Sequence, residues 1–497
     1  MPKYFLGIDQ GTTGTTVLLI NEKWDVVSRG YCKHKQIYPQ PGWVEHDAEE
    51  ILGACLSAVR QAVDGCPDCS KQDIVSVGID NQGETCTVWN AKTGKPIHNA
   101  LVWQDRRTAD LCDQLRETHG EYIRKTTGLY ADAYYSASKF TWILDTVEGA
   151  RDMAARGELC AGTLDSFLIY RLTNRKSWIT DASTAGRTML MNIRTGQWDE
   201  EMLDLFRIPK RILPPIHDCS QVYGVTDPAV FLGMQIPICA SLADTHAALI
   251  AQGCLDVGDI KATYGTGCFI NMITGKDCVL PGNGLTVSLP FQINGKRTYA
   301  FDGSVYIAGA AVDWLKDGLG LIASASDTQR LAESVSGTNS MYFVPAFNGL
   351  AAPWWDQYAR GTIVGITASV TKAHLVRATL ESIAFQVYDN MEAMRKCAGT
   401  APGMLRAGGG PVDNAFLMQF QADILGSPVQ IPVEKETSAY GAAFLAALAI
   451  GEFGSICDSR QCLKMKMCYE PQLSEDERLS KIDMWHKAVQ YSRNWAR

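Results

Sequence analysis

The sequence has no hydrophobic run long enough to cross a membrane, and its first residues lead straight into an apolar strand pattern without a signal peptide. It also lacks an excess of basic residues, since 46 Lys and Arg stand against 54 Asp and Glu, a formal net charge of -8. Binding to nucleic acid or to an anionic lipid surface favours the opposite balance. We therefore expect a cytoplasmic protein that binds neither nucleic acid nor membrane.

The sequence shows no sign of a disulfide framework, a zinc site or a repeat architecture. Its 16 cysteines are scattered through apolar runs, which is typical of reduced thiols. Cys66 and Cys69 have metal-ligand spacing, but no second Cys or His pair follows at zinc-site distance, so we interpret them as part of a surface loop. There is no repeat of solenoid period and no low-complexity tract. The 497 residues, 46% of them hydrophobic, are enough for two sizeable cores.

The most informative pattern lies at residues 6–20, where two apolar runs flank a turn rich in glycine and threonine. This pattern predicts a β-hairpin whose glycines let the backbone approach a bound group, while N–H groups and hydroxyls cradle an anion. The turn residues are Gly11, Thr12, Thr13 and Gly14. Asp9 precedes the turn, where its carboxylate can hold a divalent cation through water. Such a site suits a nucleotide phosphate with Mg²⁺, although the pattern alone also fits an ordinary polar hairpin.

A second pattern of the same kind lies at residues 260–273, where two apolar runs flank a turn that contains Thr266 and Gly267. Two phosphate-type hairpins, one near the start of each half, predict a duplicated, two-lobed fold with a nucleotide in the cleft between the lobes. Strands alternate with helices along the chain, which indicates the α/β class. We place the domain boundary near residue 250, with an N-terminal domain at 1–250 and a C-terminal domain at 251–497.

Several further elements follow from periodicity. Residues 48–63 have apolar positions at helical spacing, and Asp47 can cap this helix. Residues 74–79 are typical of a buried strand. The stretch at 110–240 is more helical, and within it we expect residues 181–187 to form a polar loop.

Two other glycine-rich segments precede helices. One contains Gly309, and the other, at residues 408–414, contains Gly410 and Asn414. Free N–H groups at a helix N-terminus bind anions, and glycine permits close approach of the ligand. Each segment alone could equally serve tight packing between a helix and a strand. Together with the two hairpins, they favour a nucleotide site.

Asp244 follows a strand and starts a helix of small residues between the two lobes. A carboxylate there can take the proton from a substrate hydroxyl as it attacks a γ-phosphate, although a helix N-cap is the simpler alternative. Glu84, Trp103 and Tyr134 could line a polyol pocket, since a carboxylate and an indole N–H bind hydroxyls. Sequence spacing alone does not bring these three residues together.

Long motifs in this chain resemble the FGGY family of carbohydrate kinases, and within it the glycerol kinase branch. The motifs lie at residues 7–13, 36–47, 102–109, 264–268, 344–356 and 416–426. The resemblance implies two ribonuclease-H-like domains of the actin/hexokinase type that close over MgATP and a sugar or polyol. It implies that Asp244 is the catalytic base and that Asp9 is the Mg²⁺-associated carboxylate. It also places Thr12, Thr13, Thr266, Gly309, Gly410 and Asn414 at nucleotide-contacting positions, and Glu84, Trp103 and Tyr134 at glycerol-contacting positions.

Two departures from the glycerol kinase pattern concern the substrate. Gly83 stands where those kinases carry Arg, and Thr245 where they carry Gln. Both changes remove hydrogen-bond donors and open volume, so we expect a C4–C5 polyol such as erythritol to be the better substrate. The alternative is a true glycerol kinase whose pocket compensates for the absent Arg. Outside this class, a non-catalytic sugar sensor on the same fold is a further hypothesis.

The resemblance also bears on assembly and regulation. Homo-dimers and tetramers are common in the family, so either is an expectation that nothing in the sequence demands. Residues 230–235 lack the Gly-rich, Arg-bearing loop that binds fructose 1,6-bisphosphate in some bacterial glycerol kinases. We therefore expect no such regulation.

Overall fold

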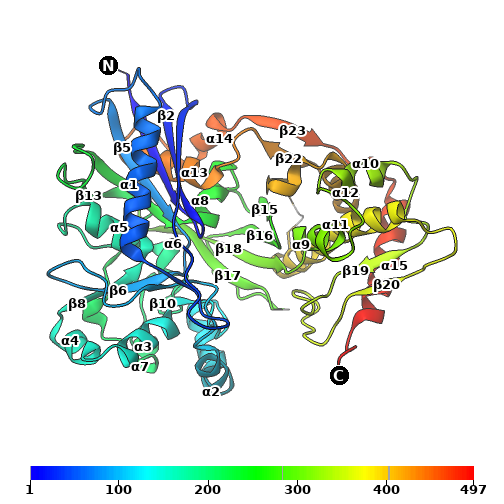
Figure 1. The fold of residues 1–497 in the computed structure, drawn as a ribbon, viewed down its shortest axis with the longest axis horizontal. Coiled ribbons are helices and arrows are strands. Elements are labelled where there is room, and N and C mark those ends of the chain that lie inside the picture. Colours follow the sequence, from blue (N-terminus) through cyan, green and yellow to red (C-terminus); the bar gives the residue numbers. More distant parts are fainter. Residues whose placement is uncertain (1, 283, 401–402) are drawn as a thin grey trace.

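The computed structural model describes residues 2–282, 284–400 and 403–497. Two large mixed β-sheets, formed by different halves of the chain, organise the fold (Figure 1). The first sheet has six strands in the order β13-β14-β5-β1-β2-β3. Their bounds are β1 Tyr4–Gln10, β2 Gly14–Asn21, β3 Val26–Lys33, β5 Ile74–Asn81, β13 Ser220–Val225 and β14 Pro237–Ala243. The predicted first hairpin is therefore confirmed as β1 and β2.

The register of the first sheet places several polar residues at one edge. β1 pairs parallel with β5, and β5 pairs parallel with β14, so the carboxyl ends of all three strands meet at the same edge. Asp9 on β1 lies opposite Asp80 on β5, and Asp80 lies opposite Leu242 on β14. Helix α8 (Asp244–Ala251) begins directly after β14 and carries the predicted base at its first position.

The second sheet has seven strands in the order β17-β18-β16-β15-β21-β22-β23. Their bounds are β15 Ile260–Tyr264, β16 Cys268–Gly275, β17 Thr286–Ile293, β18 Lys296–Val305, β21 Leu405–Gly409, β22 Val429–Pro432 and β23 Met465–Tyr469. The second predicted hairpin is confirmed as β15 and β16. β15 also pairs parallel with β21, with Tyr264 opposite Gly409, which brings the second Gly-rich segment beside the hairpin turn.

Helices cover the sheets and join the two halves. Helix α1 (Ala48–Asp64) begins where predicted, and the Asp47 side chain caps it by accepting hydrogen bonds from two backbone N–H groups. Helix α13 (Thr437–Ala449) lies near the end of the chain but packs against β1, β5 and β14 of the first sheet (Figure 1). A Cβ atom at Gly7 would overlap the carbonyl oxygen of Ala439, so glycine is required for this close approach. The first core therefore includes a helix from the second half of the chain.

Residues 110–240 are more helical than the part before them, as predicted, and β8 from this stretch joins three earlier strands in the four-stranded sheet β4-β7-β6-β8. The elements of this sheet and of the helical stretch are β4 Glu45–His46, β6 Cys86–Asn90, β7 Ala100–Leu101, β8 Leu159–Thr163, α2 Ala109–Thr127, α3 Ser136–Thr146, α4 Ala150–Arg156, α5 Leu164–Leu172, α6 Ala182–Ala185 and α7 Glu200–Leu205. The short strands are β9 Thr180–Asp181, β10 Met191–Asn192, β11 Gln197–Trp198, β12 Ile216–His217, β19 Tyr342–Val344 and β20 Thr362–Val364. The remaining helices are α9 Gly309–Asp313, α10 Asp327–Glu333, α11 Lys372–Ala398, α12 Ala415–Leu425, α14 Ser459–Cys462 and α15 Glu475–Ser492. Within the described ranges, no helix is both long and apolar enough to span a bilayer.

The prediction of a polar loop at residues 181–187 is wrong. This segment contains the short helix α6, and its polar side chains are buried. Asp181 accepts hydrogen bonds from the backbone N–H groups of Ser183 and Thr184, and the Ser183 hydroxyl accepts one from the backbone N–H of Ala243 at 3.0 Å. The polar residues are therefore partners for buried backbone groups rather than a solvated surface.

Candidate active site

Three carboxylates gather at the carboxyl edge of the first sheet. Asp9 and Asp80 are the last residues but one of neighbouring parallel strands, and Asp244 starts the helix that follows the third strand. Ligands bind preferentially outside the carboxyl ends of parallel strands, where successive loops diverge. This edge is therefore a candidate site for a charged ligand.

Electrostatic effects at this edge favour a bound cation. Burial and the charge of Asp244 raise the pKa of Asp9 to about 7. Burial and the charge of Asp9 raise the pKa of Asp80, and burial also raises the pKa of Asp244. Among the described residues, however, no three His, Cys, Asp or Glu side chains are grouped so as to hold a metal ion by themselves. One or two carboxylates, together with waters and substrate phosphates, are the ligands that Mg²⁺ prefers.

Hydrogen bonds within the turn and from neighbouring side chains fix the turn of the first hairpin. The backbone N–H of Gly11 donates to the carbonyl of Gly14 at 3.0 Å, and the Gln36 side chain donates to the carbonyl of Thr12 at 2.8 Å. The indole N–H of Trp103 donates to the Thr12 hydroxyl at 2.9 Å. Thr13 is exposed at the tip of the turn. The hydrogen bond from Trp103 to Thr12 joins a residue predicted for the substrate to one predicted for the nucleotide.

The second hairpin turn lies against the start of α9. The backbone N–H of Gly309 donates to the carbonyl of Gly265 at 2.9 Å, and that of Ala308 donates to the carbonyl of Thr266 at 2.9 Å. A Cβ at Gly309 would lie 2.6 Å from the Gly265 oxygen, too close for any side chain. The fold therefore brings together Thr266, Gly267 and Gly309, as the nucleotide-site hypothesis requires.

The two remaining predicted nucleotide residues differ in their surroundings. Around the Cβ position of Gly410 there is open space, which suits close approach by a ligand. Asn414 instead caps α12, since its side chain accepts a hydrogen bond from the backbone N–H of Leu417 at 3.0 Å. Its amide nitrogen donates to the Thr328 hydroxyl at 3.0 Å. Asn414 thus has a structural role of its own.

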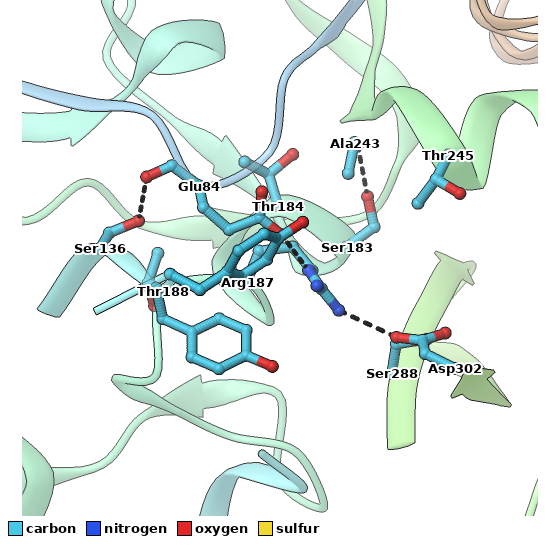
Figure 2. A network of polar contacts seen from close by, with 12 residues as sticks. Glu84, Ser136, Ser183, Thr184, Arg187, Thr188, Ala243, Thr245, Ser288 and Asp302 are labelled. Carbon is cyan, nitrogen blue, oxygen red and sulfur yellow. Dashed lines mark hydrogen bonds and ion pairs between the residues drawn. The ribbon is translucent and has the colours of Figure 1, made fainter. Parts of the chain in front are cut away.

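The predicted substrate residues Glu84, Tyr134 and Trp103 come together around Arg187, which the sequence had not singled out. Figure 2 shows Arg187 between Glu84 and Asp302. The Arg187 Nε donates to a Glu84 carboxylate oxygen at 2.6 Å, and Nη1 donates to Asp302 at 2.9 Å. The Arg187 guanidinium lies 5.9 Å from the Tyr134 ring centroid, and the rings of Tyr134 and Trp103 meet edge to face at 5.5 Å. In the sequence, Arg187 differs from its neighbours only as a long basic residue that follows a run of small ones.

A second part of this network surrounds Thr245. Its hydroxyl donates to the Asn271 side-chain oxygen at 2.9 Å and accepts from the Lys261 ammonium at 2.8 Å. Asn271 in turn donates to Asp302 at 2.7 Å, so the network runs from Thr245 to Arg187. Burial lowers the pKa of Lys261 to about 8. Sequence reasoning missed Lys261 and Asn271, because each lies in a strand pattern that reads as ordinary β-structure.

Gly83 lies beside this network with a positive φ of 50°. A Cβ there would lie 3.5 Å from the Ala243 side chain and 3.6 Å from the Arg187 Cγ, which are ordinary contact distances. The positive φ is the feature of this position that favours glycine. A longer side chain at this position would have to extend past Arg187.

Comparisons with known proteins agree with this geometry. The N-terminal domain of the FGGY family of carbohydrate kinases matches residues 4–251, and the C-terminal domain of the same family matches residues 260–450. The chain is 47% identical over 495 residues to a glycerol kinase of Parabacteroides distasonis, with 99% of each chain covered. It is 47% identical over 494 residues to glycerol kinase 2 of Thermotoga maritima, again with 99% of each covered.

Solved structures give the same result at the level of the fold. A glycerol kinase of Plasmodium falciparum, determined with ADP, superimposes with a TM-score of 0.94 at 32% identity and covers 99% of this chain and 98% of its own. A xylulose kinase of Lactobacillus acidophilus, at 22% identity, shares the fold with a TM-score of 0.85 and covers 99% of this chain and 97% of its own. The family and the actin-like fold expected from the motifs are thus confirmed. This chain belongs to the FGGY family of carbohydrate kinases and is an ATP-dependent phosphotransferase that acts on a hydroxyl group and uses Mg²⁺.

Proposed function

We propose that the enzyme phosphorylates a primary hydroxyl of a small polyol, and that glycerol is its substrate. The observation that carries this proposal is the 47% identity to glycerol kinases along essentially the whole chain. The grouping of Glu84, Trp103 and Tyr134 near Arg187 supports it, because these groups suit a compact polyol. A carboxylate, an indole and a phenol provide both hydrogen-bond partners for hydroxyls and flat faces for C–H groups.

In this mechanism Asp244 accepts the proton of the substrate hydroxyl as that oxygen attacks the γ-phosphorus and ADP leaves. Burial raises the pKa of Asp244, which makes it a stronger base once ionised. Asp9 would hold the Mg²⁺ ion, which supplies charge stabilisation for the phosphates when bound. The N–H groups and hydroxyls of the two hairpin turns would position the nucleotide, with Thr12 and Thr13 on one side and Thr266 on the other. The first turn and Asp244 thus belong to the N-terminal domain, and the second turn belongs to the C-terminal domain, with the proposed boundary near residue 250 between them.

A specific observation favours a second candidate, a C4–C5 polyol such as erythritol. Gly83 presents no side chain to the pocket, and the Thr245 hydroxyl is already bonded to Asn271 and Lys261. A substrate site with fewer free hydrogen-bond donors and more volume discriminates less against a polyol with a longer carbon chain.

The test is ATP consumption with glycerol, erythritol, D- and L-threitol, the pentitols and the ketopentoses. We expect the highest kcat/KM with glycerol. A clear preference for a C4 or C5 compound would establish the second candidate, and G83R should then reduce that preference because it refills the pocket. No turnover with any of these compounds would refute both candidate substrates.

A further inference from the structure

Asp80 is a buried carboxylate that the proposed mechanism does not use. It lies on β5 directly opposite Asp9, and the whole residue is inaccessible to solvent. Neither of its carboxylate oxygens receives a hydrogen bond from an N–H or O–H group of the described residues. Its carboxyl group interacts with the carboxyl group of Asp9. The side chain is therefore left without a conventional partner at the edge where Asp9 and Asp244 meet.

A purely structural role does not explain this arrangement. The groups whose charges act most strongly on Asp80 are the carboxylates of Asp9, Asp244 and Glu436, and all of them are repulsive. Burying a carboxylate without a donor or a cation is costly, so such groups are normally paired or bound to a metal. Asp165 provides the contrast, because this equally buried carboxylate accepts hydrogen bonds from Thr180 at 2.8 Å and from Ser241 at 3.3 Å.

We propose that Asp80 is a second carboxylate of the Mg²⁺ site and acts together with Asp9 on the ion that accompanies the nucleotide. The absence of three grouped ligand side chains in the described part of the chain agrees with an ion held through water and phosphate oxygens. The inference rests on the enzyme's use of MgATP and adds one residue to the site. Asp80 would act through the ion's water ligands and is not itself a catalytic residue.

This role has a consequence for nucleotide affinity that activity alone would not reveal. A Mg²⁺ ion beside Asp80 favours the ionised carboxylate, and that charge attracts the ion that neutralises the nucleotide phosphates. Asp80 therefore increases the gain in nucleotide affinity that Mg²⁺ provides, even when no phosphoryl transfer takes place.

The experiment measures the Kd of ADP by isothermal titration calorimetry, once with Mg²⁺ and once with EDTA, for the wild type, D80N and D80S. In both variants we expect the Mg²⁺-dependent gain in ADP affinity to shrink about ten-fold or more, the usual effect of losing a group in the outer shell of a metal. The affinity in EDTA should stay the same or increase. The matched control is D165N, which removes an equally buried carboxylate and should leave the Mg²⁺-dependent gain unchanged.

Two outcomes would overturn the inference. If D80N keeps the full Mg²⁺-dependent gain, Asp80 is only a protonated hydrogen-bond partner of Asp9, a role that the amide of asparagine also fills. If both variants lose ADP affinity equally with Mg²⁺ and with EDTA, the role of Asp80 is structural. Failure of the proposed function is distinguishable, since a different polyol substrate would leave the ADP affinity of the wild type and its Mg²⁺ dependence unchanged.

Discussion

Replacing Arg187 with methionine should destabilise the protein strongly, because it leaves a buried carboxylate without its partner. The Arg187 and Glu84 side chains are only 10% and 8% exposed, and their ion pair is 2.6 Å long. Asp302 keeps its hydrogen bonds from Asn271 and Ser288, so Glu84 bears most of the loss. Removing one partner of a buried ion pair typically costs about 3–5 kcal/mol in the free energy of unfolding. Glu84 can relieve part of this cost by taking up a proton.

The assay is urea unfolding followed by tryptophan fluorescence, with the double variant E84Q/R187M measured beside R187M. The double variant should recover at least about 1 kcal/mol, because glutamine carries no charge that needs a partner. The control is R156M, which breaks the exposed pair between Arg156 and Glu158 and should cost no more than about 1 kcal/mol. The reasoning is refuted if R187M is as stable as R156M, or if the double variant is no more stable than R187M.

Two further predictions concern the acidic edge. D244N should abolish phosphoryl transfer to the polyol while ADP still binds, as measured by calorimetry; retained turnover would exclude Asp244 as the base. The second prediction concerns the metal-free protein, in which Asp9 has a pKa of about 7, against about 3.9 in an unfolded chain. The native state then binds more protons, so the free energy of unfolding in EDTA should fall as the pH rises from about 4 to 7. D9N should flatten this dependence, and an unchanged slope in D9N would contradict the assignment.

The hairpins and Asp244 were predictable because each is a local feature. A turn rich in Gly and Thr between two apolar runs determines the two strands and the position of the turn, without information from elsewhere in the chain. The strand before Asp244 and the small residues after it likewise place that carboxylate at a strand–helix junction.

Arg187 was not predictable in the same way. Residues 181–187 are polar, and polarity in a short segment normally indicates a loop. Here Asp181 and Ser183 bond to buried backbone groups, and Arg187 bridges Glu84 in the turn after β5 and Asp302 on β18. These partners are more than 100 positions apart in the sequence from Arg187, so only the tertiary fold identifies them.

The position of the acidic edge depends on a packing arrangement that joins distant parts of the chain. On β5, a Cβ at Gly78 would overlap the carbonyl oxygen of Ala442 in α13. On α13 itself, a Cβ at Gly441 would overlap the carbonyl oxygen of Ala247 in α8. Because no side chains separate these backbones, the strand that carries Asp80 and the helix that starts at Asp244 are both held directly against α13. A helix from beyond the proposed boundary at residue 250 thus sets the distance between carboxylates that belong to the first half of the chain.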